Sequence, residues 1–120
     1  SDVNILSGTV KHSQIDTSFG LFITPGLQDG TNVNILIRPQ HLKIDFDRNG
    51  KGPDPTVQDG VPARGLVKRS RFVGKESQVE LIMETDSKVL KATIPGAFLP
   101  SVGTPLWLSM RRDRCFVFAE

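Results

Sequence analysis

Apolar and polar residues alternate along most of this chain, which is the pattern of β-strands. In the segment 78–84, Val79, Leu81 and Met83 alternate with mostly polar neighbours. Successive side chains of a strand point to opposite faces, so the alternation predicts a strand with one buried face. The same reasoning predicts further strands at residues 5–10, 19–23, 33–37, 63–73, 90–94, 106–111 and 116–118.

Turn-forming residues separate these segments at fairly regular intervals, and no segment shows the apolar stripe of an amphipathic helix. Short strands at such spacing predict an all-β barrel or sandwich. Within 63–73, where the alternation is imperfect near Gly65 and Gly74, we expect a bulge or a sharp bend. The turn signals are Pro25-Gly26, Asp29-Gly30, Asn49-Gly50, Asp59-Gly60, Gly74, Pro95-Gly96 and Gly103.

The segment 46–60 interrupts the strand pattern with Pro53, Pro55 and several glycines. We interpret it as a loop that joins two β-rich halves, about residues 1–45 and 61–120. A length of 120 residues suits one domain, residues 1–120, in which the two halves share a core.

Composition narrows the function only a little. The net charge of +2 neither requires nor excludes nucleic acid, and no apolar run approaches the ~18 residues that cross a bilayer. Cys115, the single cysteine, cannot form an internal disulfide, which fits the cytosol. His12 and His41 lack zinc-site spacing, and neither a nucleophile elbow nor a phosphate-binding loop occurs. We therefore predict no catalytic residue and no metal ligand.

Two local patterns have both a functional and an ordinary interpretation. Residues 45–50 match the first half of a calcium loop, but Thr56 stands where a glutamate should be, so we expect a simple Asp/Asn/Gly turn. Residues 68–72, Lys-Arg-Ser-Arg-Phe, suit single-stranded nucleic acid. The chain has no tyrosine to extend a stacking platform, so a solvated strand face is the favoured interpretation.

The strand at 33–37 runs directly into Arg38-Pro39-Gln40-His41. Pro39 cannot donate to a ladder and holds Arg38 extended, so the strand ends here in a turn. We expect the Arg38 guanidinium to bind a carboxylate or carbonyl of a neighbouring element, and Leu42 to anchor the turn in the core. The segment is thus predicted to be a rigid corner.

Three stretches in order resemble one known family. They are ILIRPQHL (35–42), ARGLVKRSRFVGKESQVELIM (63–83) and SVGTPLWLSMRRDRCFVFAE (101–120). Together they resemble the C-terminal regulatory domain, called TOBE or transport-associated OB, of ABC importer ATP-binding subunits. The resemblance covers nearly the whole chain and is firmest from Val33 onward.

The resemblance implies an OB-fold-like β-barrel architecture of the TOBE/MOP-like type, built from intertwined halves. It implies regulation and homodimerisation with a second copy, and no catalysis in this fragment. ATP and Mg would bind a missing upstream ATPase domain, and the parent subunit would serve permease subunits at the cytoplasmic face of the membrane. Residues 92–110 look most like those of ferric iron importers.

The same resemblance implies which residues carry the regulatory role. Gln40 stands where the family commonly has an acidic residue, so a role that needs that charge does not transfer to this chain. The regulatory corner would be Arg38, Pro39, Gln40 and His41, and the subunit-contact or ligand turns would contain Phe72, Val73, Gly74, Arg112 and Arg114.

Two alternatives stay open. One is a barrel that binds a small oxyanion, as related molybdate-binding barrels do, through backbone amides near glycine turns and a nearby Arg or Lys. The other is a domain that binds single-stranded nucleic acid, a partner that the leading hypothesis does not include.

Overall fold

We analysed a computed structural model of the chain, which describes residues 3–120. The predicted all-β class is confirmed, and the two helices found are single 3₁₀ turns, η1 (Pro39–His41) and η2 (Arg112–Arg114). Neither is long and apolar enough to cross a membrane. The strands are β1 (Asn4–Thr9), β2 (Gln14–Thr17), β3 (Gly20–Ile23), β4 (Asn32–Ile37), β5 (Leu42–Phe46), β6 (Ala63–Phe72), β7 (Glu76–Met83), β8 (Val89–Pro95), β9 (Pro105–Met110) and β10 (Phe116–Ala119).

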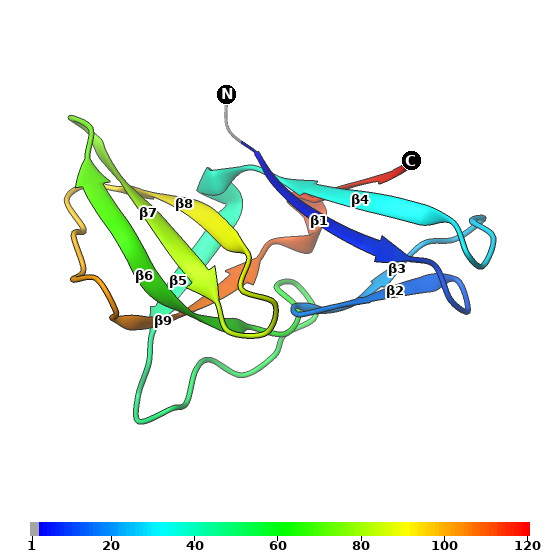
Figure 1. Cartoon of the computed structure of the whole chain (residues 1–120), viewed down its shortest axis with the longest axis horizontal. Helices are drawn as coiled ribbons and strands as arrows, with labels where there is room; N and C mark the ends of the chain where they lie inside the picture. The colour runs from blue at the N-terminus through cyan, green and yellow to red at the C-terminus, as the bar shows by residue number, and fades with distance from the viewer. Residues whose placement is uncertain (1–2) are drawn as a thin grey trace.

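The strands form two groups that lie side by side, one at the left and one at the right of Figure 1. The left group is an antiparallel sheet in the order β5-β9-β6-β7-β8, curved into a half-barrel. The right group contains the sheet β1-β4-β10 and the hairpin β2-β3. Each sheet takes strands from both halves of the sequence, because β5 pairs with β9 and β10 pairs with β4.

Two antiparallel crossings connect the groups. The chain passes from β4 through η1 into β5, and it returns from β9 through η2 into β10. On the left, Leu42 pairs with Met110, and on the right, Leu36 pairs with Phe116. The two 3₁₀ turns therefore lie opposite each other where the ribbon changes sheets. We call residues 38–41 and 111–115 the junction.

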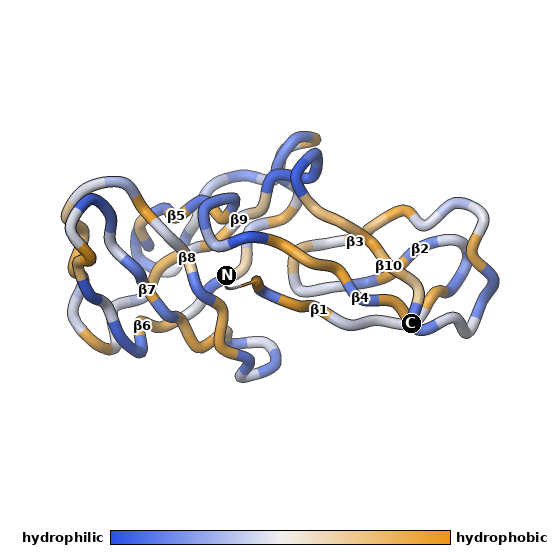
Figure 2. Tube along the Cα trace, turned by 90° about the horizontal axis from the view of Figure 1, so that it is seen from above, coloured by the Kyte–Doolittle hydropathy of each residue, from blue (hydrophilic) through white to orange (hydrophobic). Residues whose placement is uncertain are grey.

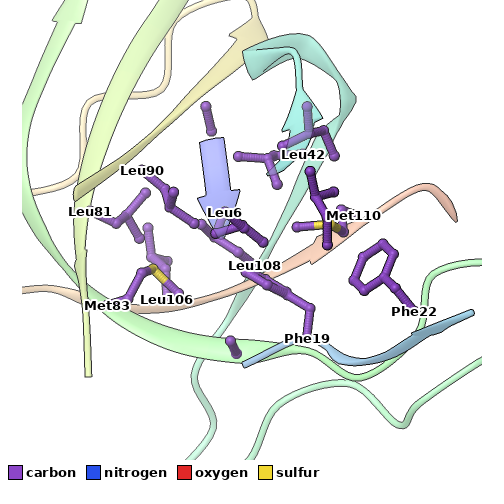
Figure 3. Packing of buried hydrophobic residues seen from close by; sticks show 14 of the residues in the cluster. Leu6, Phe19, Phe22, Leu42, Leu81, Met83, Leu90, Leu106, Leu108 and Met110 are labelled. Carbon is purple, nitrogen blue, oxygen red and sulfur yellow. The ribbon is translucent and has the colours of Figure 1, made fainter. Parts of the chain in front are cut away.

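One hydrophobic core extends through both groups. Leu6 of β1 and Phe19 beside β3 meet Leu106 and Leu108 of β9 in the middle of the molecule (Figure 3). Leu106, Leu108 and Met110 are fully buried, while the residues between them are half-exposed. The period-two pattern of the sequence thus corresponds to one buried face per strand.

The structure adds strands that the pattern did not resolve and relocates the bulge. β2 was not predicted, since only Ile15 of its four residues is apolar and buried. The register of β6 against β7 shifts between Val67 and Arg69, not at a glycine. Gly65 lies in regular register, and a Cβ there would approach Met83 Sδ to 2.9 Å, so close packing explains this glycine.

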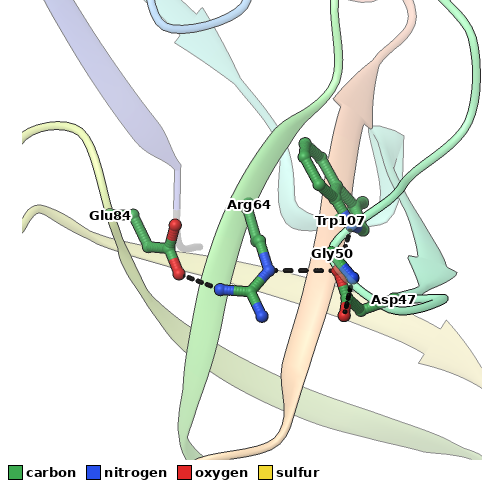
Figure 4. A network of polar contacts seen from close by, with 5 residues as sticks. All are labelled: Asp47, Gly50, Arg64, Glu84 and Trp107. Atoms are coloured by element: carbon green, nitrogen blue, oxygen red, sulfur yellow. Dashed lines mark hydrogen bonds and ion pairs between the residues drawn. The ribbon is translucent and has the colours of Figure 1, made fainter.

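The loop that follows β5 is fastened to the half-barrel by Asp47 (Figure 4). Its Oδ1 accepts hydrogen bonds from Arg64 Nε at 3.0 Å and from Trp107 Nε1 at 2.8 Å, and its Oδ2 accepts from the Gly50 amide at 3.0 Å. Arg64 also pairs with Glu84. Chiefly through the Arg64 hydrogen bond, these donors lower the pKa of Asp47 to about 2.

This geometry explains the calcium-like pattern at residues 45–50. Asn49 (φ 57°) and Gly50 (φ 85°) form a tight two-residue turn between Arg48 and Lys51, which hydrogen-bond to each other in both directions. The oxygens of Asp47 face N–H donors, as described above. The expectation of an ordinary Asp/Asn/Gly turn is therefore confirmed.

Candidate functional site

The junction is built by backbone hydrogen bonds within and between the two turns. The His41 amide donates to Arg38 O at 2.9 Å, and the Arg114 amide donates to Arg111 O at 3.0 Å. The Arg111 amide donates to His41 O at 3.4 Å, which links the two crossings. Pro39 is buried, and Leu42 is 3% exposed in the core beneath. The turn predicted at residues 38–41 is therefore present in the structure.

The partner predicted for Arg38 is absent, however, within residues 3–120. The Arg38 side chain is exposed and makes no hydrogen bond or ion pair there. The alternation of β4 gives the reason, since Ile37 is buried and the next side chain must point to the outer face of the sheet. Arg38 lines a shallow apolar depression of about 270 Å³ beside Phe116 and Phe118. Gln40 is also exposed.

Arg112 has the role that the sequence had assigned to Arg38. Its Nη1 donates to Leu21 O at 3.1 Å and its Nη2 donates to Phe19 O, while the guanidinium lies 3.7 Å from the ring centroid of Phe22. A Cβ at Gly60 would collide with this guanidinium. Arg112 forms no ion pair within residues 3–120, and burial lowers its pKa. It joins η2 to the β2-β3 hairpin.

Four basic side chains remain at the surface of the junction: Arg38 and His41 from the first crossing, and Arg111 and Arg114 from the second. Asp113 Oδ2 lies 3.0 Å from Arg111 Nη2 and 3.9 Å from Arg114 Nε. The Nδ1 atom of His41 is buried without a hydrogen-bond partner.

These charges affect His41 directly. Burial lowers the pKa of His41, and the charges of Arg114, Arg38 and Arg111 lower it further. Asp113 acts in the opposite direction. The imidazole is therefore held neutral near physiological pH, in a field that is net positive.

Two depressions open beside the junction. One has a volume of about 530 Å³, and charged residues of both signs line it. The other has a volume of about 400 Å³ and is mostly apolar. Val57 and Arg112 lie at the border of both. The first is lined by Lys43, Val57, Gln58, Asp59, Arg111, Arg112 and Asp113, and the second by Leu21, Phe22, Ile23, Val57, Gly60, Arg112, Cys115 and Val117.

The outer surface of the sheet β1-β4-β10 is apolar at the end nearest the junction. Ile5, Leu36 and Phe116 are directly opposite one another across the three strands, so their side chains share one face. Phe118 lies on the same face, with its ring 6.4 Å from that of Phe116. Ile5, Phe116 and Phe118 are 50%, 54% and 51% exposed. We call Val3, Ile5, Leu36, Phe116 and Phe118 the apolar face.

The sequence pattern alone did not identify the apolar face. Its signal was the run Phe116-Val117-Phe118, which is apolar at every position and therefore has no solvent-facing polar side. In the hydropathy view, apolar segments of β4 and β1 run along the same group of strands (Figure 2). β10 is also an edge strand, so its outer backbone groups have no neighbour in the sheet.

The other predicted turn lies away from the junction. Phe72 and Val73 are 47% and 43% exposed at the tip of the β6-β7 hairpin, where Gly74 has φ 95°. This tip is at the far end of the half-barrel (Figure 1). The structure therefore does not bring Phe72, Val73 and Gly74 together with Arg112 and Arg114.

Comparison with known proteins identifies the family. The TOBE domain family model matches residues 35–118, and this chain belongs to the TOBE domain family. The match spans both crossings and the whole half-barrel. No curated protein sequence matches the chain.

The fold is similar to that of a solved molybdate-binding protein. The cytoplasmic molybdate-binding protein ModG, in a crystal form with molybdate bound, superposes with a TM-score of 0.72. The alignment covers 98% of this chain and 96% of that chain, at 11% sequence identity. At that identity the likeness establishes the OB-like TOBE/MOP fold, which confirms the predicted architecture.

Proposed function

We propose that this chain is the regulatory and dimerisation domain of the ATP-binding subunit of an ABC-type solute importer. The TOBE family match and the ordered motifs from Ile35 to Phe118 support this proposal. In this proposal, the chain performs no catalysis, and ATP and Mg bind an ATPase domain encoded upstream. The subunit acts at the cytoplasmic side of the membrane with permease subunits.

The observation that carries the dimerisation role is the apolar face. Its five side chains converge on one surface of a three-stranded sheet and extend to an unpaired edge strand. Exposed apolar surface of this kind, rimmed by polar groups, marks protein interaction sites. The rim includes Arg38 at one end and the hydrogen-bonded pair Ser7–Asn34 at the other. A second copy can cover the face and extend the sheet along β10.

Light scattering after gel filtration tests the dimer. We expect the chain to elute as a dimer, and Phe118→Lys to elute as a monomer at the same concentration. Leu99→Lys is the matched control, because Leu99 is exposed to a similar extent (55%) but lies in the loop between β8 and β9. If the unaltered chain stays monomeric at high concentration, or if both variants behave alike, the apolar face is not the dimer interface.

The proposal that this chain is part of an importer's ATP-binding subunit has a separate test. The coding sequence upstream of Ser1 should encode a phosphate-binding loop followed by a strand that ends in an aspartate. A ferric iron substrate is the specific form of this proposal, supported by the likeness of residues 92–110 to iron importers. Growth on limiting iron after deletion of the gene would test it; unchanged iron uptake would exclude iron as the solute.

A second candidate function is binding of a small oxyanion, which the fold likeness to ModG favours. Calorimetry with molybdate, tungstate, sulfate and phosphate tests it, and heat from one anion alone would support it. The nucleic-acid alternative predicts affinity that falls steeply with salt. The absence of binding to a fluorescent oligonucleotide at low salt would end that alternative.

A further inference from the structure

We infer that the junction binds a phosphate group, held between the two crossings by Arg111 and Arg114 with Arg38 and His41 beside them. This inference does not depend on the importer proposal. It concerns which surface of this chain attracts a doubly charged oxyanion, and it fixes the residues that do so.

The strand pairing brings the two 3₁₀ turns together. The two turns lie far apart in the sequence, yet the paired strands on both sides hold them opposite each other. Each turn carries basic residues at its ends: Arg38 and His41 on η1, and Arg111 and Arg114 on η2. The Arg111 amide donates to His41 O, so the second turn is attached directly to the first. Four basic groups thus share one corner of the molecule.

The charges at this corner do not balance. Among the described residues, the guanidinium groups of Arg38, Arg111 and Arg114, beside the neutral imidazole of His41, have one carboxylate within ion-pair distance, that of Asp113, whose side chain is 63% exposed. An exposed ion pair is weak and screened by salt, so Asp113 neutralises the cluster only in part. Burial and then the charges of Arg114, Arg38 and Arg111 lower the pKa of His41, so all three guanidinium charges act at the imidazole. A dianion placed there relieves this repulsion.

The side chains at the junction are of a kind that binds phosphate. Guanidinium groups present forked N–H donors that match the oxygens of phosphate, and they stay charged at any physiological pH. His41 has a buried Nδ1 atom without a partner at the same place. Arg111 also borders the solvent-open depression of about 530 Å³, which Lys43, Arg112 and the carboxylates of Asp59 and Asp113 line as well.

Binding at the junction has a structural consequence. The two crossings are the connections through which each sheet continues into the other. A ligand that contacts η1 and η2 together would restrain the relative orientation of the half-barrel and the sheet β1-β4-β10. The site is therefore placed where a small anion could act on the geometry of the apolar face.

Titration calorimetry and thermal melts of the full chain with inorganic phosphate, against chloride at matched ionic strength, test the inference. We expect saturable heat and a melting temperature that rises with phosphate. The double variant Arg111→Gln/Arg114→Gln should lose both. Arg69→Gln/Arg71→Gln is the matched control: it removes the same charge from exposed positions on β6 and should bind as the unaltered chain does.

Asp113→Asn provides a gain of function that misfolding cannot imitate. Removing the competing carboxylate should tighten phosphate binding about two- to fivefold, as expected from the strength of an exposed ion pair. Vesicles of phosphatidylcholine with and without phosphatidic acid distinguish a lipid headgroup from free phosphate as the source of the group. Binding only to the vesicles that contain phosphatidic acid would assign the site to the headgroup.

Absence of any response to phosphate or phosphatidic acid would overturn the inference. So would loss of binding in the β6 control with retention in the junction variant. Molybdate binding that survives Arg111→Gln/Arg114→Gln would leave the second candidate function standing and place its site elsewhere. Dimerisation measured by light scattering is a separate result that none of these outcomes decides.

Discussion

The guanidinium of Arg112 lies 3.7 Å from the centroid of the Phe22 ring and donates to the carbonyls of Phe19 and Leu21 on the same hairpin. It thereby connects the second crossing to β2-β3, a hairpin that forms its own two-stranded sheet. A cation over an aromatic face in a partly desolvated position is stabilising. Arg112 therefore supports the right-hand group of strands from the junction.

This role predicts a contrast between two arginines. Arg112→Ala should lower the free energy of unfolding by about 1–3 kcal/mol, because two carbonyls lose a charged donor and the Phe22 ring loses its cover. Arg38→Ala should change it by less than about 0.5 kcal/mol, since Arg38 is exposed and without a partner within residues 3–120. Urea unfolding of both variants measures the difference; equal effects would contradict the assignment.

Acid should loosen the long loop through Asp47. Its pKa is about 2 in the folded chain, against an ordinary value of 3.8. A depressed pKa gives stability that is present above the ordinary value and is lost as the pH falls from 3.8 towards 2. Unfolding midpoints measured between pH 5 and about 2 should fall less in Asp47→Asn than in the unaltered chain. Parallel pH profiles would show that Asp47 has no such role.

The fluorescence of Trp107, the single tryptophan, should report on the attachment of the same loop to the half-barrel. Trp107 packs against Gly52, and a Cβ at residue 52 would collide with the indole ring. Gly52→Ala should therefore displace the ring, break its hydrogen bond to Asp47 and shift its fluorescence to longer wavelength. Val57→Ala in the same loop is the control, because Val57 is 99% exposed and the spectrum should stay unchanged.

Strands with one face in the core were the ones that the sequence pattern predicted. Period-two alternation identified β7 and β9 because each has one face in the core. It missed β2, where Ile15 is the only large buried side chain, so burial alone could not produce an alternating pattern. The bulge expected within residues 63–73 is present in β6, but its position was not predicted, because it falls at Lys68, where no glycine marks it.

The candidate site shows a different limit. The sequence indicated a corner at Arg38-Pro39 because proline chemistry is local. The arginine that binds backbone carbonyls near this corner is Arg112. Its position depends on the pairing of β10 with β4 and on the packing of the β2-β3 hairpin against η2. That is tertiary information, and no local pattern distinguishes Arg112 from Arg38. The apolar face has the same origin, since its residues come from three strands.

The side chain of Asn4 should stabilise the contact between the two groups of strands. Its Nδ2 donates to Lys91 O and its Oδ1 accepts from the Lys91 amide, both at 2.8 Å, so the side chain pairs with β8 as another strand would. Asn4→Ala leaves both backbone groups without this partner. We expect the Lys91 amide to exchange with deuterium about five- to 150-fold faster, from the roughly 1–3 kcal/mol that such a loss costs. Unchanged exchange would show that the contact is not maintained in solution.

Ser77 should contribute more to stability than its size suggests. It is fully buried, and its Oγ donates to Gly96 O and accepts from the Phe98 amide, both at 2.7 Å. Ser77→Ala leaves the Gly96 carbonyl and the Phe98 amide without this partner in a partly buried segment, so we expect a loss of about 1–3 kcal/mol in urea unfolding. Ser7→Ala is the matched control: its hydroxyl bonds Asn34 on an exposed face and should cost less than about 0.5 kcal/mol. If the two variants unfold at the same urea concentration, the segment after β8 is held by its apolar contacts and not by Ser77.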